Sequence, residues 1–272
     1  MLWTRRSDGK EPILVFIHGW GMNATAMYPF QETASKLGFA TINFDLPGHG
    51  HSKDEKGSFK EAIKSIKELV GDKKCILFAY SLGGFIAQQY ASKYPVDGLF
   101  LISTAFLNPI LAFSKDPIKM YKILSSVFLL SSEKSKYTYF SKFVKDVIIQ
   151  NKNPKPKILD KSRCDFLNLK HVNELLFFYE CLSRTSLDIM ADYFKDMCKF
   201  KYKKLKNNGA SLVISGSDDA YISNFSGRLL ALKLSGKHIL LPRTNHLSII
   251  HKKNKIQKIF KKWLIANYIK PE

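Results

Sequence analysis

The sequence has 272 residues, and its 43 Lys and Arg against 23 Asp and Glu give a formal charge of +20 at pH 7. The 45% hydrophobic content is enough to bury a core, which excludes intrinsic disorder for most of the chain. No apolar run approaches the roughly 18 residues that a membrane-spanning helix needs, and the first ten residues lack the apolar segment of a secretory signal. We therefore expect a cytoplasmic protein whose positive charge attracts acidic proteins, nucleic acid or anionic lipid.

The four cysteines do not indicate a metal site or a disulfide framework. Cys75, Cys164, Cys181 and Cys198 lie far apart, without a C-x-x-C pair and without a histidine at zinc-ligand spacing. We expect reduced, buried thiols.

From residue 13 to residue 102, short apolar runs alternate with helical patterns. The runs predict strands at Ile13–Ile17, Ala40–Phe44, Cys75–Ala79 and Gly98–Ile102. The patterns between them predict helices at Ala24–Leu37, Phe59–Val70 and Leu82–Lys93. Strands that alternate with helices indicate an α/β protein with a mostly parallel, twisted sheet and helices on both faces.

The alternation stops after residue 105. Residues 106–200 are rich in Phe, Leu and Lys, follow helical patterns and contain no convincing strand. Beyond them the sequence predicts strands at Ser211–Ile214 and His238–Leu241 and helices at Asn224–Leu234 and Lys253–Tyr268. A segment this long is unusual as a structureless loop. We therefore expect an α/β core, residues 1–105 and 201–272, and a helical lid, residues 106–200, over the carboxyl edge of the sheet.

The segment Ala79-Tyr80-Ser81-Leu82-Gly83 lies between a predicted strand and a predicted helix. A serine at the tip of such a turn projects its hydroxyl above the sheet, and small residues two positions before and after it let strand and helix pass closely. Ala79 stands where glycine is usual. Ser81 is the candidate nucleophile; the alternative is a serine that only caps the following helix.

A serine nucleophile needs a histidine base, and the base needs an acid that orients it. Asp218 and Asp219 follow one late strand, and His246 follows the next, in the chain order serine, acid, histidine. We favour Asp219 as the acid, keep Asp218 as the fallback, and choose His246 as the base because it follows a strand at the carboxyl edge.

The oxyanion that forms on attack needs backbone donors. The N–H of Leu82, directly after the candidate nucleophile, is one, and we assign the other to Trp20 in the loop His18-Gly19-Trp20-Gly21. The Trp20 indole would also line the acyl site as an apolar wall, unless it only packs.

Taken together, these motifs resemble the α/β-hydrolase superfamily. The resemblance rests on segments His18–Gly21, Asp45–Gly50, Tyr80–Gly84, Gly216–Asp219 and Asn245–His246. The short start before the first apolar strand, the HGWG loop and the DLPGHG turn look like the carboxylesterases of biotin synthesis, which demethylate pimeloyl-acyl carrier protein methyl ester.

This resemblance implies a hydrolase, a serine carboxylesterase with Ser81, His246 and Asp219 as its triad, Trp20 and Leu82 as oxyanion donors, and no cofactor. It also implies an acyl carrier protein as partner. Residues 106–200 contain no motif that aligns, so contacts with the substrate do not carry over.

An acyl carrier protein is small and acidic, which suits a basic esterase. Five cationic residues of the expected lid are candidates for contacting it, although each is equally consistent with an ordinary solvated surface: Lys115, Lys119, Lys122, Arg163 and Arg184. We expect the enzyme to be a monomer.

Two other functions remain open from the sequence. The first is a lysophospholipase or monoacylglycerol lipase whose Phe- and Leu-rich lid lies on a membrane surface. The second is a non-catalytic binding protein with an inherited hydrolase fold. Nucleic acid is not an expected partner, because RNA-binding aromatic motifs and arginine-rich patches are absent from the sequence.

Overall fold

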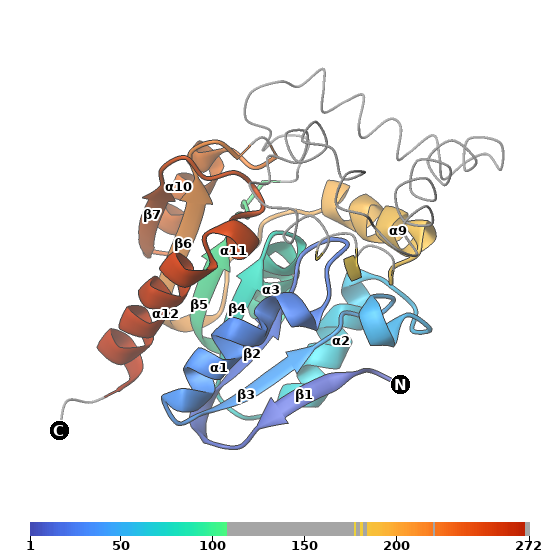
Figure 1. The fold of residues 1–272 in the computed structure, drawn as a ribbon, viewed down its shortest axis with the longest axis horizontal. Helices are drawn as coiled ribbons and strands as arrows, with labels where there is room; N and C mark the ends of the chain where they lie inside the picture. The colour runs from blue at the N-terminus through green and yellow to red at the C-terminus, as the bar shows by residue number, and fades with distance from the viewer. Residues whose placement is uncertain (108–176, 178–179, 182–183, 220, 270–272) are drawn as a thin grey trace, which may run out of the picture.

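The computed structural model describes residues 1–107, 177, 180–181, 184–219 and 221–269. They contain a seven-stranded sheet in the order β1-β3-β2-β4-β5-β6-β7 (Figure 1). The strands are β1 (Thr4–Ser7), β2 (Lys10–Ile17), β3 (Phe39–Phe44), β4 (Cys75–Tyr80), β5 (Val96–Ile102), β6 (Asn207–Gly216) and β7 (Lys237–Leu241). Only β1 runs antiparallel to its neighbour; the other six strands are parallel.

Helices cover both faces of this sheet. They are α1 (Tyr28–Lys36), α2 (Phe59–Val70), α3 (Leu82–Lys93), α9 (Leu187–Cys198), α10 (Asn224–Lys233), α11 (Ser248–His251) and α12 (Lys253–Tyr268), with short 3-10 turns at Ala24–Met27 and Gly50–Ser52. The side chains of α1 and α12 pack into one apolar cluster and those of α2, α3, α9 and α10 into the other. The sheet therefore has a separate hydrophobic layer on each face, as alternating strands and helices predict.

The α12 layer is built around aromatic rings. Phe78 of β4 stacks on Phe100 of β5 with centroids 5.0 Å apart, and Phe260 of α12 contacts both rings edge-on. All three side chains are fully buried. Such pairs add to the stabilisation from buried area and fix α12 across the middle of the sheet.

Three helix starts have serine caps that the sequence encodes. Ser58, Ser186 and Ser223 each accept a hydrogen bond from the backbone N–H three residues later, at the starts of α2, α9 and α10. These bonds satisfy amides that the helix itself leaves unpaired.

The six strands predicted from apolar runs are confirmed, and so is the mostly parallel sheet with helices on both faces. The sequence did not predict β1, a half-exposed edge strand whose central residues are Arg5 and Arg6. The predicted helix at residues 24–37 is a 3-10 turn followed by α1, with Pro29 in the first turn. An edge strand buries too little surface to need an apolar run, which is why the pattern missed it.

Within the expected lid, α9 is helical, and most of residues 106–200 lie outside the described residues. Two bonds attach α9 to the core: the Tyr193 hydroxyl donates to Pro47 O at 3.0 Å, and Phe59 N donates to Asp196 Oδ2 at 2.8 Å. The division into core and lid stays a prediction.

None of the helices in the described ranges is both long and apolar enough to cross a bilayer. Cys75 and Cys181 are buried, which raises the pKa of each thiol to about 12, and Cys198 is half-buried. These three cysteines are free, as expected; Cys164 lies outside the described residues.

Candidate active site

Ser81 occupies a sharp turn between β4 and α3. Its backbone has φ 51° and ψ −115°, an unusual conformation for a residue with a side chain, and its N–H donates to Ile102 O at 2.9 Å. A Cβ on Gly83 would collide with the carbonyl oxygens of Ile17 and His18, so only glycine lets α3 approach β2 this closely. Strain of this kind persists where the surrounding structure enforces it, and it is concentrated at functional sites.

The structure brings together Ser81, His246 and Asp219, which lie on three separate segments. Ser81 Oγ lies 2.8 Å from His246 Nε2, and His246 Nδ1 lies 2.8 Å from Asp219 Oδ2. An ionised Asp219 accepts the Nδ1–H, which leaves the Nε2 lone pair directed at the serine hydroxyl. The arrangement can remove a proton from Ser81 and return it to a leaving group.

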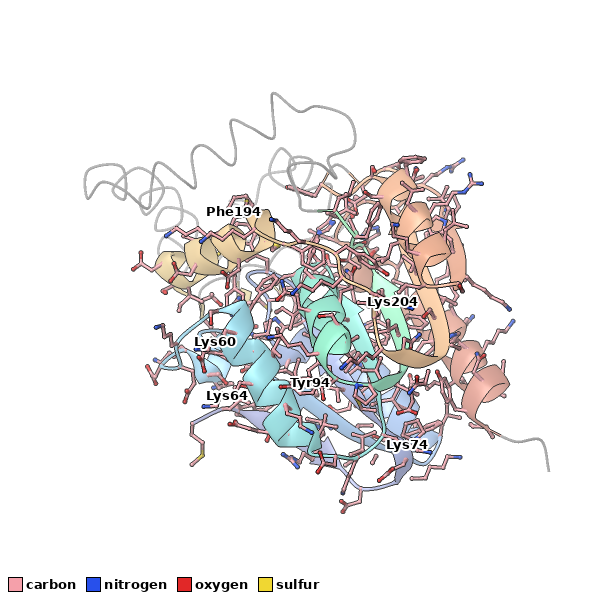
Figure 2. All side chains as sticks on the ribbon, turned by 180° about the vertical axis from the view of Figure 1, so that it is seen from behind. Lys60, Lys64, Lys74, Tyr94, Phe194 and Lys204 are labelled. Atoms are coloured by element: carbon pink, nitrogen blue, oxygen red, sulfur yellow. The ribbon has the colours of Figure 1, made fainter. Side chains whose placement is uncertain are left out.

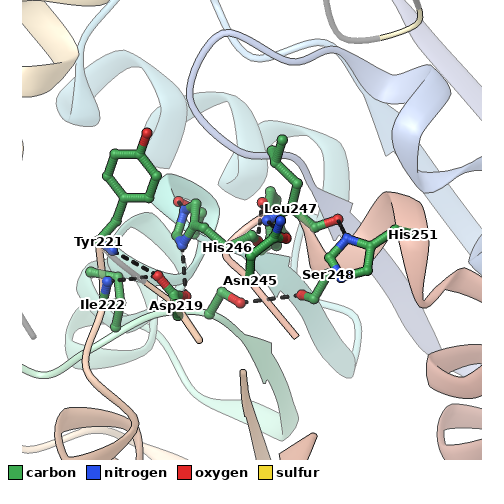
Figure 3. A network of polar contacts seen from close by, with 11 residues as sticks. Asp219, Tyr221, Ile222, Asn245, His246, Leu247, Ser248 and His251 are labelled. Atoms are coloured by element: carbon green, nitrogen blue, oxygen red, sulfur yellow. Dashed lines mark hydrogen bonds and ion pairs between the residues drawn. The ribbon is translucent and has the colours of Figure 1, made fainter. Parts of the chain in front are cut away.

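Backbone donors fix the Asp219 carboxylate (Figure 3). Its Oδ1 accepts the N–H groups of Tyr221 and Ile222, each at 2.9 Å, while Oδ2 faces the imidazole. Asp219 is 3% exposed, so its charge is shielded from water. Asp218 is exposed, and its carboxylate accepts the Ser217 hydroxyl at 2.8 Å. Of the two candidate acids, Asp219 is therefore the one placed to orient His246.

Two tyrosines that the sequence analysis did not single out contact His246. The Tyr80 hydroxyl donates to the backbone carbonyl of His246 at 2.7 Å, and the Tyr221 ring lies 5.1 Å from the imidazole. Burial, together with the charge of Asp219, raises the pKa of Tyr80 well above its usual value, so the hydroxyl stays a donor. Tyr80 thus ties the turn before α3 to the loop that carries His246. The only sequence signal for either residue is its position, directly before Ser81 for Tyr80 and two residues after Asp219 for Tyr221.

Leu82 follows Ser81 directly, and Trp20 follows Gly19 in a turn near Ser81. Leu82 is the first residue of α3, and the amides of a first helical turn have no partner within the helix. The turn that contains Trp20 passes close to Ser81, because a Cβ on Gly19 would lie 3.4 Å from Ser81 Cβ. Their role as oxyanion donors stays a prediction.

The Trp20 side chain makes a contact that the sequence did not predict. Its Nε1 donates to Met190 O of α9 at 2.8 Å, and its ring lies 6.1 Å from that of Phe194. The indole therefore connects the loop after β2 to α9 above the carboxyl edge.

Two buried histidines support the same loop. His18 Nε2 accepts Leu46 N at 2.9 Å, so its Nδ1 carries the proton donated to Gly19 O, also at 2.9 Å. Burial lowers the pKa of both His18 and His49, whose rings lie 5.1 Å apart. Two neutral imidazoles thus connect the HGWG loop to the DLPGHG turn.

Of the cationic residues expected to contact a partner, only Arg184 is described. Its guanidinium contacts His51 Nε2 and Glu180 Oε1, each at 3.0 Å. Arg184 therefore has partners within its own chain. The other four, Lys115, Lys119, Lys122 and Arg163, lie outside the described residues. Among the residues that the structure describes, no group of three His, Cys, Asp or Glu side chains could hold a metal ion.

Comparison with known proteins places this geometry in a family. The family profile described as alpha/beta hydrolase fold matches residues 12–253. The chain is 36% identical over 105 residues to a pimeloyl-[acyl-carrier protein] methyl ester esterase of Vibrio campbellii, covering 37% of this chain and 39% of that protein. A protein of the same name from Shewanella woodyi is 33% identical over 101 residues, with 36% and 38% covered. These matches span well under half of the relatives' length.

Solved structures agree on the fold. A carboxylesterase structure from Nitrososphaera gargenis superposes with a TM-score of 0.71 at 17% identity, covering 97% of this chain and 94% of that one. The enol-lactonase of Burkholderia xenovorans gives 0.69 at 16% identity, with 97% and 96% covered. The profile match spans most of the sequence, and the chain belongs to the α/β-hydrolase fold family.

Proposed function

We propose that the protein is a serine carboxylesterase that works through an acyl-enzyme. The observation that carries this proposal is the continuous chain from Ser81 Oγ through His246 to the buried Asp219, with two contacts of 2.8 Å at a strained strand-to-helix turn. A non-catalytic binding protein would have no use for a buried carboxylate that orients a histidine toward a serine.

The reaction follows from this geometry. His246 Nε2 takes the Ser81 proton as Oγ attacks the ester carbonyl, and the N–H groups of Leu82 and Trp20 stabilise the oxyanion. The tetrahedral intermediate collapses, and His246 gives its proton to the departing alcohol. Water then attacks the acyl-enzyme, with His246 as base, and the acid leaves as Ser81 regains its proton.

The proposed substrate is pimeloyl-acyl carrier protein methyl ester, hydrolysed in the cytoplasm by a monomer. Support comes from the relatives of this name, which match 37% and 36% of the chain. The carrier protein would be both partner and substrate.

Turnover of three esters tests this proposal: methyl pimeloyl-acyl carrier protein, free methyl pimelate and a long-chain monoacylglycerol. We expect the carrier-linked ester to give the highest kcat/KM, with methanol as a product. Preference for the monoacylglycerol would contradict the carrier-linked substrate and favour the lipase alternative. Failure to hydrolyse any ester would contradict the esterase itself.

A further inference from the structure

Positive charge is distributed unevenly along the chain. Residues 1–105 contain 12 Lys and Arg against ten Asp and Glu, whereas residues 199–272 contain 16 against three. The first segment builds strands β1 to β5, and the second builds β6, β7 and helices α10 to α12. The excess positive charge is therefore concentrated in the C-terminal segment of the chain.

Much of that charge lies on one face of α12. Lys255, Lys258, Lys261 and Lys262 are exposed and recur at helical spacing, and α12 contains no acidic residue. The opposite face of the helix, which includes Phe260 and Trp263, is buried against the sheet. In the part of the chain that the structure describes, no carboxylate lies within ion-pair distance of these four ammonium groups. We call this set the α12 lysine face.

Helix α2, which packs on the opposite face of the sheet and carries Lys60 and Lys64 (Figure 2), differs in this respect. Lys64 pairs with Glu68 at 3.7 Å, and Lys67 pairs with Asp72 at 2.6 Å. Two lysines of α2 thus have acidic partners, whereas the four lysines of the α12 lysine face have none among the residues that the structure describes.

The α12 lysine face also begins near the candidate active site. His246 precedes the short helix α11, and α12 starts at Lys253, next to α11 at the carboxyl edge (Figure 1). Arg243, three residues before His246, is exposed in the loop at that edge. Basic residues therefore occur in the loop that carries His246 and along the outer surface of α12.

We propose that the α12 lysine face is the docking surface for an acidic carrier protein. This rests on the proposed function: a carrier bound there would place the base of its flexible acyl arm near the end of α12 closest to His246. Docking charges of this kind raise the association rate and make it dependent on salt.

The composition of the face favours a protein over a membrane. A helix that binds in the bilayer interface inserts an apolar face, and the apolar face of α12 is already buried in the core. Ile265 is the one large apolar side chain exposed on α12, at 42%.

A charge-reversal experiment tests the proposal. One variant carries Lys258→Glu, Lys261→Glu and Lys262→Glu; the matched control carries Lys60→Glu, Lys64→Glu and Lys74→Glu, exposed lysines of α2 and of the segment after it. We expect the α12 variant to lose about tenfold in kcat/KM on methyl pimeloyl-acyl carrier protein at low salt, with much of its salt dependence. Turnover of free methyl pimelate should stay unchanged, and the control should change little on either ester.

Equal losses in both variants, or no loss in the α12 variant, would overturn the docking surface while leaving the esterase intact. Wild-type protein that hydrolyses free esters but not the carrier-linked one would contradict the proposed substrate and the docking surface together. Sedimentation with phosphatidylglycerol-containing vesicles completes the test: binding that the α12 reversal abolishes, with unchanged carrier turnover, would assign the face to lipid.

Discussion

The N-terminal and C-terminal segments of the chain contribute differently to the molecule. Residues 1–105 supply Ser81 and the loops with the candidate oxyanion donors, and two lysines of α2 have acidic partners. Residues 199–272 supply Asp219 and His246, and they carry most of the net positive charge. The candidate nucleophile thus comes from the N-terminal segment, the groups that would activate it come from the C-terminal segment, and partner recognition is proposed for the C-terminal segment alone.

Replacing Ser81 with alanine should cause the largest loss of activity, because it removes the hydroxyl that the N-terminal segment supplies for covalent chemistry. We expect ester hydrolysis to fall by about 10⁴-fold or more. Circular dichroism and thermal unfolding should show an intact fold. Residual turnover near the wild-type rate would move the nucleophile elsewhere.

Removing the Asp219 carboxylate, which the C-terminal segment supplies, should lower activity nearly as much. Asp219→Asn should lower kcat by about 10⁴-fold, because the amide no longer holds the Nδ1–H tautomer of His246. Asp218→Asn is the matched control, since its carboxylate contacts Ser217, and it should change kcat by less than about threefold. Steady-state kinetics of both variants checks this, and the reverse order would make Asp218 the acid.

Tyr80→Phe removes a hydrogen bond that joins the N-terminal and C-terminal segments. Without the 2.7 Å bond from its hydroxyl to His246 O, the base should be less well positioned, and we expect kcat to fall about tenfold. KM should stay nearly constant, because the hydroxyl donates its hydrogen bond to His246 O. A rise in KM at unchanged kcat would mean that Tyr80 acts in binding and not in positioning.

The smallest effect concerns the contribution of His18 and His49 to stability. Folding keeps His18 and His49 neutral, with pKa values below the ordinary one, whereas the unfolded chain takes up protons below about pH 6.5. Their contribution is therefore complete above that pH and is lost as the pH falls, by up to about 1.4 kcal/mol per pH unit for each.

Urea unfolding at pH 7.5 and pH 5.5 measures this loss. His49→Gln should reduce the slope of the unfolding free energy against pH by about the amount that one histidine contributes. An unchanged slope in this variant would contradict a buried, neutral His49.

The comparison also explains what the sequence could predict. Buried parallel strands need apolar runs, so β2 to β7 could be located, whereas β1 shields little surface and its Arg5-Arg6 pair resembles a loop. Ser81, Asp219 and His246 could be nominated from the sequence because each follows a strand at the carboxyl edge, where parallel strands bring their ends together. Tyr80 was missed because its partner, His246 O, is 166 residues away. The α12 lysine face depends on knowing which side of the helix the sheet covers.

The central claim is that the N-terminal and C-terminal segments of the chain together form one serine-hydrolase site. Labelling with a fluorophosphonate tests it most directly. The wild-type protein, Asp219→Asn and Asp218→Asn are treated with the probe, and the modified residue is located by mass spectrometry of peptides. We predict a single adduct on Ser81, formed rapidly in wild type and Asp218→Asn and far more slowly in Asp219→Asn. No adduct, an adduct on another serine, or equal rates in all three proteins would contradict the account.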